Sequence, residues 1–226
     1  MGKFSSRVSI AAAIVSLGLV SLGQAVFNED GDWQFWNQDA VTYKITDSVT
    51  VCSDAMFRLG DDASELWYQH YDVGVNFKVK KRLTVKPSFR LKKIKRAGKW
   101  EEISNPSLNV ILSHKVGGVK LKNNCRFSYW NYDTEFNMKD RWFYRNILMV
   151  ESSRSLTSIE LKPFIKEDFF FDCEEEKINR NRLSTGLLIG KPKILSPTLY
   201  LMWQAYKPMN DWVDNYIVGV DVKIPF

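Results

Sequence analysis

Metal ligands and long apolar runs are scarce in this sequence of 226 residues, and each scarcity excludes a class of protein. Only two histidines occur, His70 and His114, and the chain has no C-x-x-C pair, so a metal site is not expected. After residue 25, charged residues interrupt every apolar stretch before it reaches the roughly 20 residues that a membrane-spanning helix requires. We therefore predict no metal, no cofactor and no transmembrane helix in the mature chain.

Cysteine and one-sided charge are also limited. Cys52, Cys125 and Cys173 are odd in number and far apart, so at least one thiol stays unpaired and the pairing of the others is left open. The net charge is +6, but 32 basic residues are mixed with 26 acidic ones along the whole chain. A nucleic-acid-binding protein gathers its basic residues on one face, so we expect no nucleic acid partner.

The N-terminal segment has the order of a secretory signal peptide. Lys3 and Arg7 give a basic start, and the apolar run Ile10–Leu22 follows and ends at small residues that suit a signal peptidase. The run is too short to span a bilayer as a helix. We predict that residues 1–25 are the signal and that residues 26–226 form a single domain of an exported protein.

The mature chain alternates apolar and polar residues in short segments separated by turn residues. In residues 73–79 every second residue is apolar, from Val73 to Val79, and the residues between them are glycine or polar. This period-two pattern predicts strands with one apolar face. The segments are predicted at residues 33–45, 49–59, 65–79, 83–94, 100–114, 119–132, 140–151, 157–171, 178–189, 198–207 and 213–226.

The succession of hairpins predicts an all-β fold, an antiparallel up-and-down transmembrane β-barrel. Short connections such as 80–82 and 116–118 alternate with longer or more charged ones such as 133–139, as expected for the two ends of a membrane barrel. The pattern gives eleven strands, whereas bacterial single-chain barrels almost always have an even number. We therefore predict 10 or 12 strands, with 33–45 or 198–207 as the segment most open to doubt.

The last strand carries the most specific local pattern. Its alternate residues are apolar up to the final Phe226, and the residues between them are mostly polar. This resembles the terminal strand that outer-membrane barrels present to their assembly machinery. The predicted assembly signal is Tyr216, Val218, Val220, Val222, Ile224 and Phe226. The expected location is the bacterial outer membrane, with outer-membrane lipid, lipopolysaccharide and the barrel-assembly machinery as partners.

Five segments also match a known family in order along the chain. They are Trp33–Asn37, Phe57–Leu66, Asn179–Leu183, Tyr200–Gln204 and Asp211–Trp212. With them the chain resembles the bacterial family catalogued as domain of unknown function 2490. The resemblance implies an outer-membrane barrel and brings no established active site, so it assigns no catalytic residue. The three cysteines are not part of the family's pattern.

The polar face of the predicted strands gathers charged residues inside one small barrel. Arg180 and Arg182 share a face, where they would meet phosphates or acidic side chains of the lumen. A barrel of this size holds either a lumen plugged by salt bridges or a narrow path with a cationic bias. The predicted lumen residues are Asp54, Arg58, His70, Asp72, Lys78, Arg90, Lys120, Lys122, Arg126, Lys162 and Arg182.

Catalysis is not expected, although His70 is the best candidate for a base. Alternation places it beside Asp72 on one face of a strand, where a His–Asp pair would orient the imidazole. No G-x-S-x-G motif surrounds a serine that would act as its nucleophile. The sequence thus predicts a narrow pore or a closed structural barrel. A lipid-modifying enzyme of the outer membrane and a soluble periplasmic ligand-binding β-protein stay open as alternatives, and the sequence names no solute and no oligomeric state.

Overall fold

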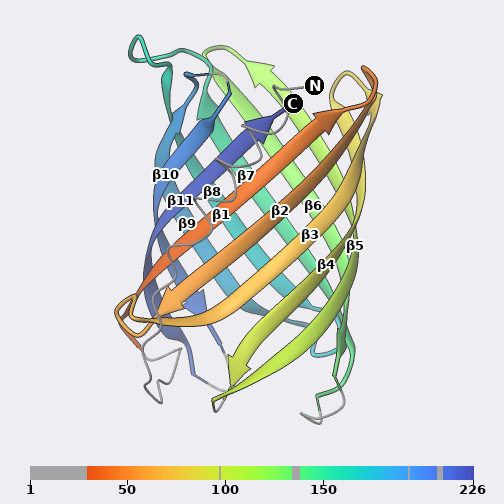
Figure 1. Cartoon of the computed structure of the whole chain (residues 1–226), viewed down its shortest axis with the longest axis vertical. Coiled ribbons are helices and arrows are strands. Elements are labelled where there is room, and N and C mark those ends of the chain that lie inside the picture. The colour runs from red at the N-terminus through yellow and green to blue at the C-terminus, as the bar shows by residue number, and fades with distance from the viewer. Residues whose placement is uncertain (1–29, 97, 134–137, 193, 208–210) are drawn as a thin grey trace, which may run out of the picture.

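Eleven strands in the described part of the chain close into one barrel (Figure 1). The computed structural model describes residues 30–96, 98–133, 138–192, 194–207 and 211–226, so the predicted signal peptide lies outside the described residues. No helix in this described part is long and apolar enough to cross a membrane. The strands are β1 (Asp32–Lys44), β2 (Val49–Gly60), β3 (Glu65–Lys80), β4 (Leu83–Arg96), β5 (Lys99–Val116), β6 (Val119–Tyr132), β7 (Arg141–Ser152), β8 (Leu161–Asp172), β9 (Lys177–Ile189), β10 (Ser196–Tyr206) and β11 (Val213–Pro225).

Strands that follow one another along the chain pair in antiparallel fashion, and the barrel closes through a parallel pair, β1 with β11. An odd number of antiparallel strands brings the last strand back in the direction of the first, so a parallel seam is the only way to close it. The seam runs from Asp32 opposite Asn215 to Thr42 opposite Pro225. The predicted count of 10 or 12 strands is therefore wrong, because the two doubted segments are both real strands, β1 and β10.

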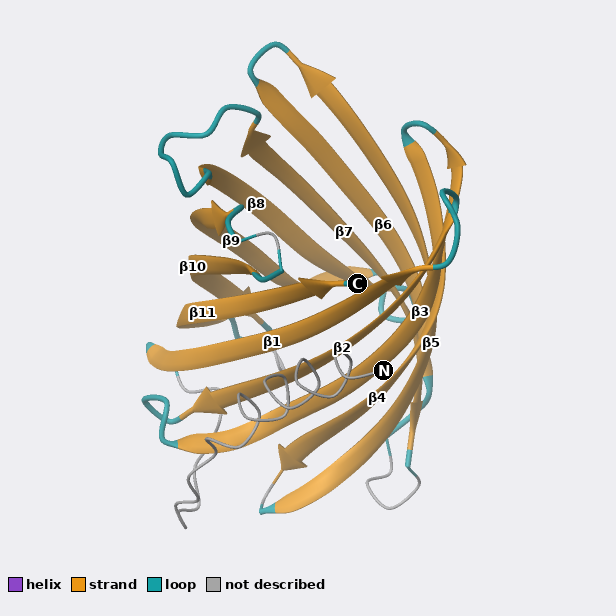
Figure 2. Cartoon of the chain, turned by 45° about the horizontal axis from the view of Figure 1, so that its top comes forward, coloured by secondary structure: helices purple, strands orange, loops and turns teal. Residues whose placement is uncertain are grey.

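The two ends of the barrel carry different connections. The carboxyl end holds Phe226 and the connections that follow β1, β3, β5, β7 and β9, and Figure 2 brings this end forward. The opposite end holds the connections that follow β2, β4, β6, β8 and β10. The prediction that the short connections share one end is wrong, because residues 153–160, between β7 and β8, form a long connection at the carboxyl end.

The outer face of the barrel is apolar. Every strand turns alternate side chains outward, and large apolar side chains remain exposed there, among them Val73, Leu108, Leu201 and Val218. Five exposed tryptophans lie toward the opposite end of the barrel: Trp33, Trp100, Trp142, Trp203 and Trp212. Tryptophan and tyrosine gather where a membrane meets water, so this ring has the place and composition of an aromatic girdle.

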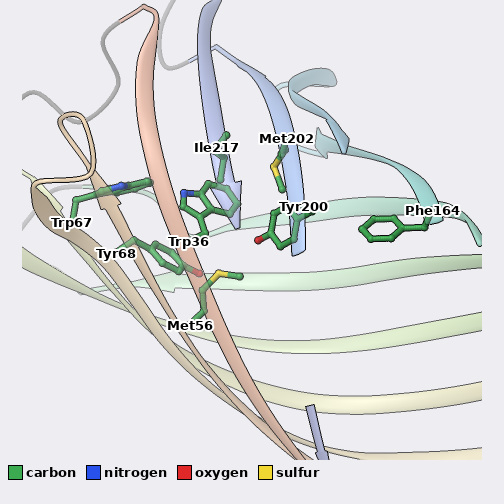
Figure 3. Packing of buried hydrophobic residues seen from close by; sticks show 8 residues of the cluster. All are labelled: Trp36, Met56, Trp67, Tyr68, Phe164, Tyr200, Met202 and Ile217. Atoms are coloured by element: carbon green, nitrogen blue, oxygen red, sulfur yellow. The ribbon is translucent and has the colours of Figure 1, made fainter. Parts of the chain in front are cut away.

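The core of the protein lies inside the barrel rather than between layers. Figure 3 shows the buried apolar side chains that project into the lumen from six strands. They are Trp36, Met56, Trp67, Tyr68, Phe164, Tyr200, Met202 and Ile217. The Tyr200 ring lies against the backbone of β11, since a Cβ on Gly219 would come within 2.0 Å of it. Gly219 is thus required because the ring occupies the space of a side chain.

Candidate functional site

A large hollow opens at the end of the barrel that lies opposite Phe226, and we call it the vestibule. Its volume is about 1180 Å³. Residues at the ends of strands, such as Arg96, Arg141 and Lys177, line its rim. Deeper residues such as Arg58 and Lys92 are only 6% and 3% exposed. The hollow therefore extends from the mouth of the barrel to side chains that are buried in its lumen.

The lining of the vestibule is strongly basic. Twelve lysine and arginine residues line it, against three acidic residues, Asp172, Glu175 and Asp211. The basic residues are Arg58, Arg90, Lys92, Lys95, Arg96, Arg126, Arg141, Arg145, Lys177, Arg180, Arg182 and Lys207. Five carboxylates outside the lining pair with some of them: Asp54, Glu65, Asp72, Glu101 and Asp168. Counting all eight acidic residues against the twelve basic ones leaves an excess of four positive charges.

Two buried carboxylates hold part of this positive charge in place. Asp72 accepts hydrogen bonds from Lys86 and Arg90, each at 3.0 Å, and Arg126 lies 3.6 Å from it. Asp168 accepts two hydrogen bonds from Arg145, at 2.7 and 2.5 Å. A buried charge without a partner is costly, so these pairs explain how the lumen tolerates so many ions.

Other basic side chains lie over aromatic rings instead of carboxylates. The guanidinium carbon of Arg58 lies 3.8 Å from the centre of the Trp36 ring and 3.9 Å from that of Tyr68. The Lys92 ammonium lies 3.2 Å from the centre of the Trp130 ring. Such contacts fix a cation without neutralising it. Within the described residues, neither Arg58 nor Lys92 forms an ion pair.

Arg180 and Arg182 share one aromatic ring on the wall of the vestibule. Their guanidinium carbons lie 5.0 and 4.8 Å from the centre of the Phe170 ring. Arg180 also lies over Tyr206 at 4.4 Å, and Arg182 over Trp36 at 4.8 Å. The prediction that these two arginines share a face of β9 agrees with this arrangement.

Ion pairs connect several residues on the rim of the vestibule. Arg141 donates to Asp172 at 2.9 Å and to Glu175 at 3.1 Å, and the Lys177 ammonium lies 2.6 Å from Glu175. The hydrogen bond from Lys177, followed by that from Arg141, holds the pKa of Glu175 below its usual range. Glu175 therefore stays ionised at neutral pH, and the basic excess lies deeper than the rim.

His70 lies in a different part of the lumen. It is 1% exposed and does not line the vestibule. Its ring nitrogens contact the Tyr68 hydroxyl at 2.9 Å and Asp54 at 2.8 Å. Asp72, the partner that alternation indicates, is engaged by lysine and arginine instead. The structure thus places the carboxylate that orients His70 on β2 rather than on its own strand.

The predicted lumen residues divide into two groups. Arg58, Arg90, Arg126 and Arg182 line the vestibule. The others lie elsewhere. Asp54 contacts His70, and Asp72 binds Lys86. Lys78 is exposed near the end of β3, Lys120 pairs with Glu151 at 3.1 Å, and Lys122 and Lys162 point inward near the carboxyl end.

Sequence reasoning missed several vestibule residues, above all Arg145. In strand β7, Arg141 is followed by three successive aromatic residues, from Trp142 to Tyr144, so both faces of this part of the strand look apolar. The inward-facing aromatic residues whose rings contact the arginine and lysine side chains were missed for the same reason. The alternating arginines of β9, Arg180 and Arg182, predict an inward polar face more clearly, because the strand alternates polar and apolar residues over part of its length.

The described part of the chain shows no cluster of three His, Cys, Asp or Glu side chains suited to hold a metal. Cys52, Cys125 and Cys173 are all free thiols. Cys125 faces outward on β6, where the Tyr144 hydroxyl donates to its sulfur at 3.4 Å.

These features define the class of the protein: a closed β-barrel with an apolar outer face and many buried charged side chains inside it. The chain belongs to the family described as protein of unknown function (DUF2490), whose model matches residues 33–214. The resemblance noted from the sequence is thereby confirmed.

Two solved structures are similar in fold. LpxR from Salmonella typhimurium has a TM-score of 0.48 and 8% identity, with 78% of this chain and 83% of that chain covered. An anion-selective porin from Comamonas acidovorans has a TM-score of 0.38 and 10% identity, with 76% of this chain and 55% of that chain covered. No curated protein matches the sequence.

Proposed function

We propose that the protein is an integral outer-membrane barrel that is closed by its own side chains and binds anions in the vestibule. The apolar outer face and the tryptophan girdle support the membrane location. A soluble periplasmic protein has no use for large apolar side chains exposed around its whole circumference. The outward apolar face of β11 supports the further proposal that this strand is read by the barrel-assembly machinery, with Tyr216 and Val218 both 41% exposed.

The packing of large side chains across the lumen is the observation that supports closure and carries the proposal. Every strand contributes inward side chains. Six strands supply the apolar cluster of Figure 3, and Ile94 of β4, Met149 of β7 and Leu188 of β9 pack against that cluster. The remaining two strands, β5 and β6, contribute the buried Asn105 and Arg126. A barrel of about eight strands is just filled by side chains, and wide channels appear at about 16. With eleven strands, the large tryptophan, tyrosine and arginine side chains supply the extra volume.

Anion binding follows from the electrostatics of the vestibule. Its walls hold an excess of four positive charges. A concave site with charge of one sign and walls of low dielectric constant concentrates ions of the opposite sign. The protein would therefore capture anionic groups at one surface of the membrane without passing them through.

Recording from planar lipid bilayers tests closure directly. The purified, folded protein is expected to insert without discrete conductance steps, because the packed layer blocks the lumen. A gel comparing boiled and unboiled samples checks that the inserted protein is folded. Regular single-channel steps from the folded protein would overturn the proposal.

A charge on the outer face tests the membrane location. Leu201 is 59% exposed in the middle of β10, so Leu201→Arg would place a cation in hydrocarbon. We expect the free energy of unfolding from lipid bilayers to fall by about 2–4 kcal/mol. Leu156→Arg, at a 66% exposed position in the connection between β7 and β8, is the control and should leave stability unchanged. Equal stability of both variants would argue against a membrane-embedded face.

A further inference from the structure

The deep part of the vestibule contains four cations, of which only Arg182 forms an ion pair among the described residues, with Asp168 at 3.5 Å. We call Arg58, Lys92, Arg180 and Arg182 the basic floor. They come from three strands, β2, β4 and β9, and all four line the same hollow. Arg58 and Arg182 both lie over the Trp36 ring, at 3.8 and 4.8 Å from its centre, and Arg180 and Arg182 both lie over the Phe170 ring, at 5.0 and 4.8 Å. The charges of Arg58 and Arg180 also disfavour the charged form of Lys92. These like charges are therefore close enough to repel one another.

Three donors of the basic floor lack a hydrogen-bond partner among the described residues. They are Nζ of Lys92, Nε of Arg180 and Nη2 of Arg182, and each is shielded from solvent. The side chains of Lys92 and Arg182 belong to residues that are only 3% and 2% exposed. A buried donor without an acceptor is destabilising, and a buried charge more so. A bound anion would relieve both the unmet donors and the repulsion.

We infer that the basic floor is a binding site for a phosphate group, such as a phosphate monoester or a diphosphate. The inference rests on the proposed function and names the ligand class of the same vestibule. A phosphate monoester carries about −1.5 to −2 charges at pH 7 and three terminal oxygens that accept strong hydrogen bonds. That charge and oxygen count match three or four cationic donors that approach from different strands.

The aromatic contacts favour phosphate further. Arg58 lies over Trp36 and Tyr68, and Arg182 over Trp36, so the faces of the guanidinium groups are covered. Nη2 of Arg182 lies in the plane of its guanidinium and stays available for a charge-assisted hydrogen bond to phosphate, whereas its Nε donates to Gln204 at 2.8 Å and its Nη1 to Asp168 at 3.5 Å. The stacked side chains are already fixed, so binding costs little ordering.

The size of the hollow indicates what surrounds the phosphate. A volume of about 1180 Å³ lies just above the roughly 300–1,000 Å³ of ordinary ligand sites, so the vestibule has room for more than a phosphate ion. The phosphate would be the buried end of a larger molecule. Two sources fit this chemistry, a soluble phosphorylated solute and the phosphorylated headgroup of an outer-membrane lipid.

Calorimetric titration of the full mature protein in neutral detergent at low salt tests the site. The probes are inorganic pyrophosphate for the soluble source, diphosphoryl lipid A in the same detergent for the lipid source, and citrate as an anion without phosphorus. We expect at least one phosphate probe to bind more tightly than citrate. Lys92→Gln and Arg180→Gln should each raise its Kd about ten- to a hundredfold.

Lys93→Gln is the matched control, because Lys93 is the next residue of β4, faces outward and pairs with Glu102 at 2.5 Å. It should leave the Kd unchanged. Lys92→Gln should also unfold at the same temperature as the parent protein or a higher one, since it removes a repelled charge. If Lys92 had only a structural role, Lys92→Gln would instead lower the unfolding temperature and would have no specific effect on phosphate binding.

The outcomes separate the inference from the proposed function. Preference for pyrophosphate supports a soluble phosphorylated ligand, and preference for lipid A supports a lipid headgroup. Citrate bound as tightly as either phosphate probe would overturn the phosphate inference but leave an anion-binding closed barrel. Equal binding by Lys92→Gln, Arg180→Gln and the parent protein would overturn the assignment to the basic floor. Conductance steps in bilayers would overturn closure alone.

Discussion

Replacing Asp72 with asparagine is expected to lower the free energy of unfolding by about 3–5 kcal/mol. The Asp72 side chain is fully buried and serves three cations, with Lys86 and Arg90 at 3.0 Å and Arg126 at 3.6 Å. Asparagine has nearly the same shape but no charge. Three cations would then lie inside the barrel with their shared counter-ion removed, and uncompensated buried charge is the costly case.

Urea unfolding of the protein in detergent, followed by tryptophan fluorescence, measures the effect. Asp47→Asn is the control, because Asp47 pairs with Lys44 at 2.5 Å in an exposed turn, where water screens the charges. Adding Arg90→Met to Asp72→Asn removes one stranded cation and should recover part of the loss. An Asp72→Asn midpoint equal to that of the parent protein would show that the buried network does not hold the lumen together.

The strands and their faces could be predicted from the sequence because a barrel wall imposes the same alternation everywhere. All eleven segments appear within a few residues of their predicted places, from β1 (Asp32–Lys44) to β11 (Val213–Pro225). The error came from adjusting this count to a general rule of even numbers. Nothing in the alternation itself tells whether the first and last strands meet in parallel or antiparallel fashion.

The contacts inside the lumen could be predicted much less well, because they depend on register between strands. Alternation places His70 and Asp72 on one face, but the partner of His70 is Asp54 on the neighbouring strand. A register shift between Arg58 and Leu59 also places Trp67 and Tyr68, which are adjacent in sequence, both inside the barrel. Strict period-two counting assigns them to opposite faces, so the aromatic support of Arg58 could not be foreseen.

Tyr200→Ala should cost about 3–5 kcal/mol of stability, in the range found for truncation of a buried aromatic ring. Tyr200 is 5% exposed, and its ring fills space above Gly219 that no other side chain of β11 occupies. Removing the ring leaves a void beside two glycines, because Gly186 also faces Tyr200. Glycine cannot extend into that void, so the wall cannot repair it by rotating a side chain. Tyr200→Phe, which retains the ring, is the matched control for the loss of volume.

The double variant Trp36→Ala with Tyr200→Ala should convert the closed barrel into a conducting one. Trp36 is 1% exposed and belongs to the same apolar layer, so the two truncations remove adjoining parts of the barrier. Discrete steps in planar bilayers are expected, with anions preferred because the vestibule keeps its positive charge. Tyr200→Phe should stay silent under the same conditions. If the folded double variant also stays silent, the lumen must be blocked by the polar network around Asp72, and the apolar layer would then contribute stability rather than closure.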